Sequence, residues 1–367
     1  MKRISQLDGV RGVAIILVLV HHYFCLQVAP AIKTPLAYFN DALNLSWSGV
    51  DLFFVLSGFL IAGILIDHRG ATNGLPVFYL RRICRIFPLY FLMLVLFFCL
   101  SSMVFSESPA FRWLFHDPFP AWSYLTFTQN YFVGTFHDYG PKWLSVTWSL
   151  AIEEQFYLMM PLVVRFLPRR VLGGAIVAGI LGAVLLRCWS PGFHSFVDLP
   201  WRADALLCGG LLALLVRWEP FINTVRRHPL FVRTLFFIFL AGTAVMTLRP
   251  AEFGAFNLLW LAGLYSVFVL MAFAETEPVI GYLLRSPAMV WVGQISYGVY
   301  LFQQPVSGLL HGLIRNSAPQ MLNLADAGVT LLAVGVTLLL AHLSFHFFER
   351  PILRFAHRFQ YFDAVSK

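Results

Sequence analysis

Histidine and glutamate residues lie inside apolar segments of this sequence, where an ionisable group costs free energy and usually has a function. Arg11 and His22 belong to the first apolar segment, and their spacing places them on one helical face about 16 Å apart. Glu153 and Glu154 interrupt a later segment at a depth close to that of His22. A histidine and a carboxylate at one depth can act as a general base and the acid that orients it. We therefore predict a catalytic role for His22 with one of the two glutamates.

An arginine cluster begins another apolar segment. It lies on the same side of the membrane as the start of the segment that contains Arg11. Arg81, Arg82 and Arg85 have i,i+3 and i,i+4 spacings, so Arg85 shares a helical face with either of the others. Planar guanidinium groups bind phosphate well, although arginines here could also anchor a helix on the cytoplasmic side. A cationic cluster and a deeper histidine together fit a long substrate with phosphates at one end and a reactive group at the other. Acyl coenzyme A is such a molecule.

The composition indicates that lipid is part of the solvent. The 367 residues are 59% hydrophobic and 12% charged, with a mean hydropathy of +0.74, whereas a soluble domain is about 45–50% apolar and about 25% charged. The formal net charge is +8, but the basic residues form short clusters between apolar runs, as in cytoplasmic loops beside anionic lipid. We therefore expect the lipid bilayer as a partner, and no nucleic acid.

The sequence predicts an all-α integral membrane domain over residues 1–367, a bundle of about ten transmembrane helices. The loops on one side carry about three times as many Lys and Arg as those on the other, which predicts that both termini are cytoplasmic. The loop over 105–144 is rich in aromatic residues and is expected to lie partly along the outer interface. The predicted spans cover residues 10–28, 49–67, 84–104, 145–167, 171–188, 201–217, 231–248, 255–273, 291–311 and 327–348.

Further polar residues in or near these spans have two interpretations, a structural polar contact or a site for the acceptor. Arg202 and Asp204 are two residues apart and do not share a helical face well, so an ion pair between them is not assured. Asp51 and Ser57 have the same two interpretations.

Metal and disulfide chemistry are not expected. The five cysteines are scattered and have no C-x-x-C spacing. His342, His346 and Glu349 share a helical face, and a metal there is conceivable, but this spacing is common by chance. We expect no metal and no bound cofactor.

Seven short motifs follow one another along nearly the whole chain. They are L-D-G-V-R-G-V-A (7–14), G-V-D-L-F-F-V-L-S-G-F-L-I (49–61), R-R-I-C-R-I-F-P-L-Y (81–90), W-S-L-A-I-E-E-Q-F-Y-L (148–158), R-A-D-A-L-L-C-G (202–209), I-S-Y-G-V-Y-L (295–301) and F-E-R-P (348–351). The ordered set resembles the acyltransferase type 3 family of integral membrane acyltransferases. This resemblance implies transfer of an acyl group, most often acetyl, from acyl coenzyme A to a hydroxyl of a carbohydrate or glycosylated acceptor. It also implies a bacterial inner membrane as the location.

The resemblance implies roles for individual residues. His22, and not its neighbour His21, matches the catalytic histidine of the family. Glu153 matches the more regular glutamate of the fourth segment, with Glu154 beside it. The residues expected to bind acyl coenzyme A are basic: Arg11, Arg82, Arg85 and, next to them, Arg81.

The chain departs from the family pattern at one position. Many relatives have a histidine after S-Y-x-x-Y-L-x, where this chain has Gln303, which can hydrogen-bond but cannot titrate. Tyr297 belongs to the same motif, and we assign both residues to an acceptor-binding or structural polar site. Some family members carry a fused extracytoplasmic esterase-like domain. This sequence shows none, so we expect the domain to act alone on its acceptor or with a separate partner.

Two alternatives stay open at this point. The buried charges could couple protons to a solute in a secondary transporter, although no internal repeat is evident. Within acyl transfer, His22 could act as a general base or could form a covalent acyl-histidine.

Overall fold

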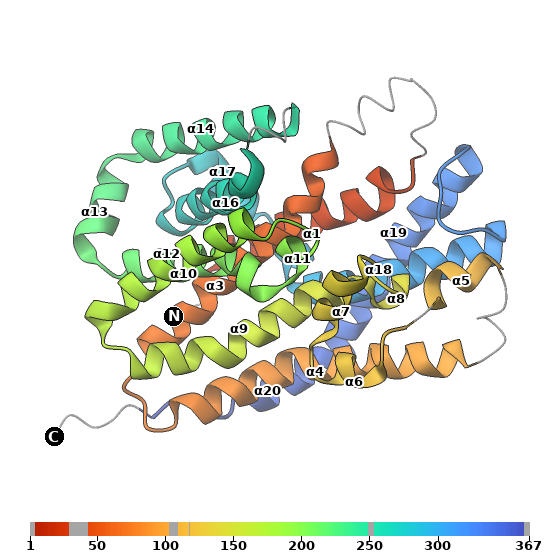
Figure 1. Cartoon of the computed structure of the whole chain (residues 1–367), viewed down its shortest axis with the longest axis horizontal. Helices are drawn as coiled ribbons and strands as arrows, with labels where there is room; N and C mark the ends of the chain where they lie inside the picture. The colour runs from red at the N-terminus through yellow and green to blue at the C-terminus, as the bar shows by residue number, and fades with distance from the viewer. Residues whose placement is uncertain (1–3, 29–42, 103–108, 117, 249–252, 363–367) are drawn as a thin grey trace.

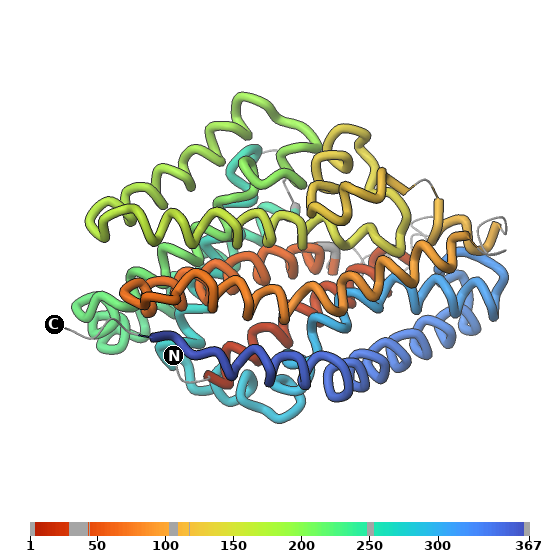
Figure 2. Tube along the Cα trace, turned by 90° about the horizontal axis from the view of Figure 1, so that it is seen from below, coloured from red at the N-terminus to blue at the C-terminus, as the bar shows by residue number. Residues whose placement is uncertain are grey.

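Helices form the fold. The computed structural model describes residues 4–28, 43–102, 109–116, 118–248 and 253–362. Within these ranges the regular structure is helical, apart from one isolated β-bridge between Val28 and Met321. The long helices run mostly along the long axis of the molecule, as Figures 1 and 2 show. The predicted all-α membrane fold is therefore confirmed.

Each predicted span overlaps one long helix of the structure. These helices are α1 (Ser5–Val20), α3 (Gly49–Asp67), α4 (Gly74–Ser101), α9 (Thr147–Phe166), α10 (Arg169–Trp189), α12 (Leu199–Leu215), α14 (Pro229–Leu248), α16 (Asn257–Ala274), α18 (Pro287–Arg315) and α19 (Leu324–Ser344). The shorter elements are η1 (His21–Cys25), η2 (Asn44–Ser48), α5 (Pro109–Phe115), α6 (Ala121–Leu125), α7 (Gln129–Phe136), α8 (Lys142–Ser145), α11 (His194–Val197), α13 (Glu219–Arg227), η4 (Gly254–Phe256), α17 (Pro278–Arg285), η5 (Phe345–Glu349) and α20 (Arg350–Ala356).

Among the described residues, fewer than ten helices qualify as membrane spans when each must be both long enough and apolar enough to cross a bilayer. Seven helices in the described part of the chain meet both requirements, or eight if the bent pair over 194–215 and 219–227 is one span. The helices α9 and α18 do not meet them, because α9 contains Glu153 and Glu154 and α18 contains several Gln, Ser and Tyr residues. The count of ten stays a prediction, and these two polar helices contribute to the site described below.

Glycines allow the central helices to approach closely. A Cβ atom on Gly58 of α3 would lie 1.9 Å from the carbonyl oxygen of Leu206 on α12. A Cβ atom on Gly209 of α12 would lie 2.0 Å from the carbonyl oxygen of Val55 on α3. The two backbones are thus in direct contact, as in membrane helix pairs that meet through small residues. This contact fixes the two helices that carry Asp51, Ser57, Arg202 and Asp204.

The first helix changes its winding at the two neighbouring histidines. α1 ends at Val20 and continues as the π-helix η1, which contains His21 and His22. Short π segments are rare and occur frequently at functional sites. No feature of the sequence predicted this change.

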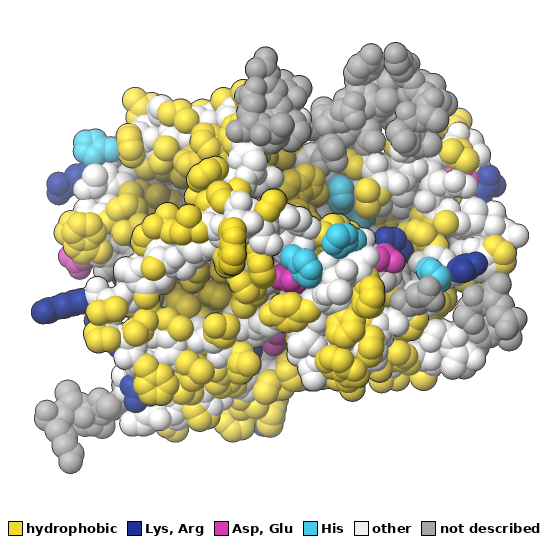
Figure 3. Space-filling model, viewed as in Figure 1, with side chains coloured by type: hydrophobic (Ala, Val, Ile, Leu, Met, Phe, Trp, Pro, Cys, Tyr) yellow, Lys and Arg dark blue, Asp and Glu magenta, His cyan; other side chains and the backbone are white. Residues whose placement is uncertain are grey.

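The face of the molecule seen in Figure 3 differs between its middle and its ends. Figure 3 shows hydrophobic side chains over much of one face, whereas the Lys and Arg visible there lie mostly toward the two ends of the long axis. Helix α1 begins and helix α20 ends toward the same end of the long axis in Figures 1 and 2. Their location on the cytoplasmic side remains a prediction.

The predicted aromatic loop over 105–144 lies partly outside the described residues. Its described part forms the short helices α5 to α8, on which Trp122, Leu125 and Phe136 are exposed. An interfacial location for these side chains remains a prediction.

Candidate active site

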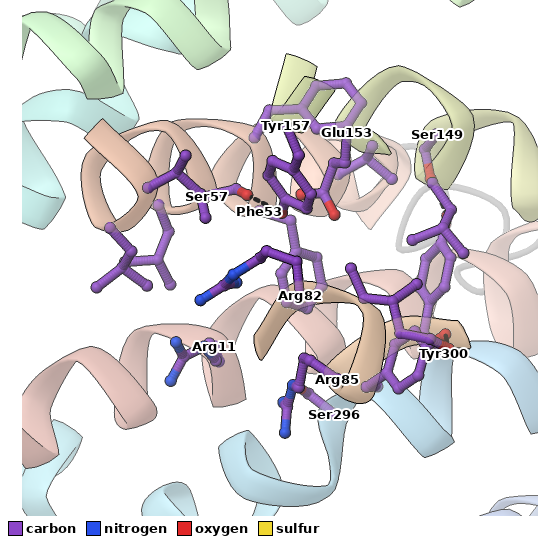
Figure 4. A pocket seen from close by; sticks show the side chains of 18 residues that line it. Arg11, Phe53, Ser57, Arg82, Arg85, Ser149, Glu153, Tyr157, Ser296 and Tyr300 are labelled. Atoms are coloured by element: carbon purple, nitrogen blue, oxygen red, sulfur yellow. Dashed lines mark hydrogen bonds between the residues drawn. The ribbon is translucent and has the colours of Figure 1, made fainter. Parts of the chain in front are cut away.

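A cavity of about 140 Å³ lies between helices α1, α3, α4, α9 and α18. Figure 4 shows that side chains from all five helices face it. Its polar lining residues are Arg11, Ser57, Arg82, Arg85, Ser149, Glu153, Tyr157, Ser296, Tyr297 and Tyr300. We call this space the inner cavity.

Three arginines are common to the walls of the inner cavity and of a larger one. Arg11 on α1 and Arg82 and Arg85 on α4 line both the inner cavity and a space of about 510 Å³, here called the entrance cavity. Arg11 forms an ion pair with Asp8, one turn earlier. Among the described residues, Arg82 and Arg85 form no ion pair with a carboxylate within 4.0 Å, so their guanidinium groups can bind an anionic ligand. The structure therefore brings together the three arginines that the sequence predicted to act jointly.

Arg81 lines the entrance cavity but not the inner one. Its guanidinium donates a hydrogen bond to the Phe359 carbonyl at 2.6 Å and lies 4.8 Å from the centre of the Tyr361 ring. Burial, together with the nearby Arg81 and Arg82, lowers the pKa of His357, which also lines this cavity. His357 therefore adds little positive charge at neutral pH, and the arginines dominate the electrostatics of the entrance cavity.

Glu153 lies across the inner cavity from the arginines. Its carboxylate is beside the hydroxyl groups of Ser57 and Tyr157, which hydrogen-bond to each other (Figure 4). Its charged neighbours are Arg82 and Arg11. Because Glu153 and Tyr157 are four residues apart on α9, they share one helical face. That spacing, within a motif already identified, was a signal that could have added Tyr157 to the predicted site.

The remaining predicted polar residues near this cavity differ in accessibility. Glu154 is a neighbour of Arg82 and Tyr297, and its Oε1 atom is buried without a hydrogen-bond partner in the described part of the chain. Tyr297 lines the inner cavity and donates to the Ile86 carbonyl at 2.7 Å. Gln303 is fully buried and does not line this cavity.

His22 lies one helical turn beyond the part of α1 that packs beside the inner cavity. The cavity extends to Val50 on α3, and the preceding Gly49 packs against Val18. Nδ1 of His22 lies 3.0 Å from the Val18 carbonyl oxygen. Because a carbonyl oxygen can only accept, Nδ1 carries the proton in this hydrogen bond and Nε2 presents a lone pair. A general base needs this tautomer when Nε2 accepts the proton.

The predicted contact between His22 and a glutamate is not formed in this structure. Among the described residues, no hydrogen bond or ion pair joins His22 to Glu153 or Glu154. The backbone carbonyl of Val18 orients the imidazole in place of a carboxylate. The prediction matched these residues by depth along their helices, but depth does not determine the direction in which a side chain points.

Asp51, Arg202 and Asp204 form buried ion pairs. Arg202 Nη1 lies 2.9 Å from Asp51 Oδ1, and both side chains are fully buried. Arg187 Nη2 lies 2.5 Å from Asp204 Oδ2. Arg202 and Asp204 do not pair with each other, in agreement with their spacing. Arg187 lies at the end of a predicted span, and no sequence pattern points to its partner. The pairs favour the structural interpretation of these three predicted residues.

We expect Arg202→Leu to destabilise the fold by about 3–5 kcal/mol, because it leaves the Asp51 carboxylate buried without a countercharge. The double variant Asp51→Leu/Arg202→Leu should recover much of this loss, since apolar replacement of a whole buried pair is often nearly neutral. Thermal unfolding of the purified protein in detergent measures both effects. A double variant less stable than Arg202→Leu would contradict this account of the pair.

The fold and this site define a class of protein, a multi-pass membrane protein with an arginine-lined cavity beside the helix that carries a half-buried histidine. The family model described as the acyltransferase domain matches residues 4–342. The chain therefore belongs to the acyltransferase domain family, and the family predicted from the motifs is confirmed. It is a multi-pass integral membrane protein of the bacterial plasma membrane.

Two curated relatives are named O-acetyltransferases. The chain is 29% identical over 381 residues to Peptidoglycan O-acetyltransferase OatA of Listeria monocytogenes, with 96% of this chain and 56% of the relative covered. It is 27% identical over 375 residues to O-acetyltransferase OatA of Staphylococcus aureus, with 94% of this chain and 56% of the relative covered. The chain thus spans about half the length of these relatives. No solved structure shows a significant match.

Proposed function

We propose that this protein transfers an acetyl group from acetyl coenzyme A to a hydroxyl of a cell-wall carbohydrate. The observation that carries this proposal is that the same three arginines, Arg11, Arg82 and Arg85, line both the entrance cavity and the inner cavity. The family assignment supplies the reaction class, and the printed name of the Listeria relative suggests peptidoglycan as the acceptor.

The donor binds with its phosphates at the three arginines. Guanidinium groups form charge-assisted hydrogen bonds with phosphate oxygens, and three of them offset much of the charge of a coenzyme A molecule. The pantetheine arm then extends into the inner cavity, between Glu153 and Tyr300, toward His22. A narrow, partly apolar cavity suits this uncharged arm.

His22 acts as the general base in this proposal. The acceptor oxygen attacks the thioester carbonyl carbon, and its proton passes to Nε2 of His22 as the new C–O bond forms. The C–S bond then breaks, and the leaving sulfur takes up the proton from the imidazolium. The hydrogen bond from Nδ1 to Val18 keeps Nε2 available for both transfers. Attack by Nε2 itself, giving an acyl-histidine that the acceptor then resolves, is the variant of this mechanism.

Glu153 and Glu154 support this reaction from the inner cavity. Glu153 positions the hydroxyls of Ser57 and Tyr157 and balances the charge of Arg82. Glu154, beside the same arginine, supplies a second acidic group. Both carboxylates lower the electrostatic cost of several arginines at one place. In this proposal they act by positioning other groups rather than by touching the imidazole.

Acceptor-dependent release of coenzyme A tests the proposed function. Purified protein would receive acetyl coenzyme A, with and without soluble cell-wall glycan fragments, and free thiol would be followed. We expect thiol release that depends on the glycan, and the label of a radioactive acetyl group in the glycan. Binding of the donor without turnover for any glycan would contradict the proposal and favour a secondary transporter.

A further inference from the structure

The chain after α20 forms part of the wall of the entrance cavity. The Thr72 amide donates to the Phe362 carbonyl at 3.0 Å, and the Phe362 amide donates to Asn73 Oδ1 at 2.8 Å. Asn73 Nδ2 donates in turn to the Gln360 carbonyl at 2.8 Å. These hydrogen bonds hold residues 357–362, here called the C-terminal segment, against the two residues that precede α4.

Two aromatic side chains, His68 and Tyr361, are in contact where the C-terminal segment passes the end of α3. The rings of His68 and Tyr361 are stacked, with centroids 3.9 Å apart and planes inclined by 7°. Both rings line the entrance cavity, and both also line a neighbouring cavity of about 200 Å³. Both rings are thus part of the wall of the space that contains the arginines.

The location of this pair matches one part of a coenzyme A thioester. The phosphates of such a donor separate its pantetheine arm from its adenosine. If the arm lies in the inner cavity and the phosphates lie at Arg82 and Arg85, the adenosine must lie on the other side of these arginines. That side is the entrance cavity, where His68 and Tyr361 lie.

We propose that the adenine ring of the donor stacks on the His68 end of the His68–Tyr361 pair, because Arg81 lies over the Tyr361 ring. This inference rests on the proposed function and assigns the nucleotide end of the same substrate. Stacking on an aromatic side chain is a common way to bind a base, because every base has a flat π-face. Arg81, held over Tyr361 and bonded to Phe359, keeps the pair in place and adds positive charge for the phosphates. The pair therefore distinguishes a nucleotide thioester from a simpler thioester.

Dissociation constants for two ligands test this assignment. Coenzyme A carries adenosine, whereas 4′-phosphopantetheine has the same arm and one phosphate but no adenine. Isothermal titration of the purified full chain would compare the wild type with Tyr361→Leu, which removes the ring on which His68 is stacked. We expect this change to weaken binding of coenzyme A by roughly 5- to 100-fold. The dissociation constant for 4′-phosphopantetheine should change by less than about twofold, because this ligand does not reach the pair.

Two further variants separate stacking from support of the C-terminal segment. Tyr361→Phe retains the ring and should bind both ligands like the wild type. Phe359→Leu removes an aromatic ring from the same segment but not from the lining of either cavity, and it should also bind normally. If Tyr361→Leu fails to fold, His68→Leu removes the other ring, and the same loss specific to coenzyme A is expected.

The outcomes also separate this inference from the proposed function. Unchanged affinity for coenzyme A in Tyr361→Leu, or an equal loss for both ligands, overturns adenine stacking while the proposed acetyl transfer stands. A wild type that binds neither ligand overturns both proposals.

Discussion

Replacement of His22 by alanine is expected to reduce acetyl transfer by about 10²- to 10⁴-fold, the range typical for loss of a general acid–base group. The expectation follows from the hydrogen bond of Nδ1 to the Val18 carbonyl, which leaves Nε2 as the basic nitrogen. Release of coenzyme A from acetyl coenzyme A in the presence of a glycan acceptor measures the effect. Titration with coenzyme A should show that the variant still binds the donor, because His22 does not line the cavity with the arginines.

His21→Ala is the matched control for this experiment. His21 occupies the same π-helix, and its ring meets that of His22 edge to face at 5.3 Å, but no hydrogen bond to Val18 orients it. We expect the His21 variant to keep its activity within a few-fold. Full activity of His22→Ala would refute the role of His22 as base and as nucleophile alike. Equal losses in both variants would instead point to damage of the π-helix.

Replacement of Arg82 by alanine is expected to raise the KM for acetyl coenzyme A by roughly 10- to 100-fold. A charge-assisted hydrogen bond contributes about 1.5–3 kcal/mol, and Arg82 faces both cavities without an ion-pair partner among the described residues. Arg82→Lys should recover part of the affinity, because lysine keeps the charge but lacks the planar fork. Steady-state kinetics with varied donor and fixed acceptor separate KM from kcat.

Arg170→Ala controls for a general loss of positive charge. Arg170 is exposed at the start of α10 and lines neither cavity, so its removal should leave KM unchanged. If Arg82→Ala left KM unchanged, the arginines would act only as helix anchors at the membrane surface. That result would remove the main support for coenzyme A as the donor.

The sequence was sufficient to predict the features that depend on composition and on spacing within one helix. The spans follow from apolar length, and each overlaps a helix of the structure. The joint location of Arg82 and Arg85 follows from their i,i+3 spacing, and both line the same cavities. The failure of Arg202 and Asp204 to pair also follows from spacing.

Features that depend on contacts between distant helices were not predictable in this way. Arg187 forms an ion pair with Asp204 because α10 and α12 pack together. The sequence near neither residue indicates this contact. The predicted contact between Glu153 and His22 was inferred from depth alone, whereas the carboxylate faces Ser57 and Tyr157. His68 and Tyr361 are far apart in the sequence, and the return of the C-terminal segment brings them together. Rotation of each helix and the paths of connecting segments decide all three cases.

The hydrogen bond between His22 and the Val18 carbonyl has a consequence for genetics. In many enzymes that use histidine, a second side chain orients the ring, and a mutational screen then finds two sensitive positions. Here the orienting atom belongs to the main chain, which every amino acid at position 18 except a helix-breaking proline would still supply. A screen of single substitutions should therefore mark His22 as intolerant and Val18 as tolerant of other apolar residues. Loss-of-function alleles would not reveal the orienting group, although each catalytic cycle of the proposed mechanism depends on it.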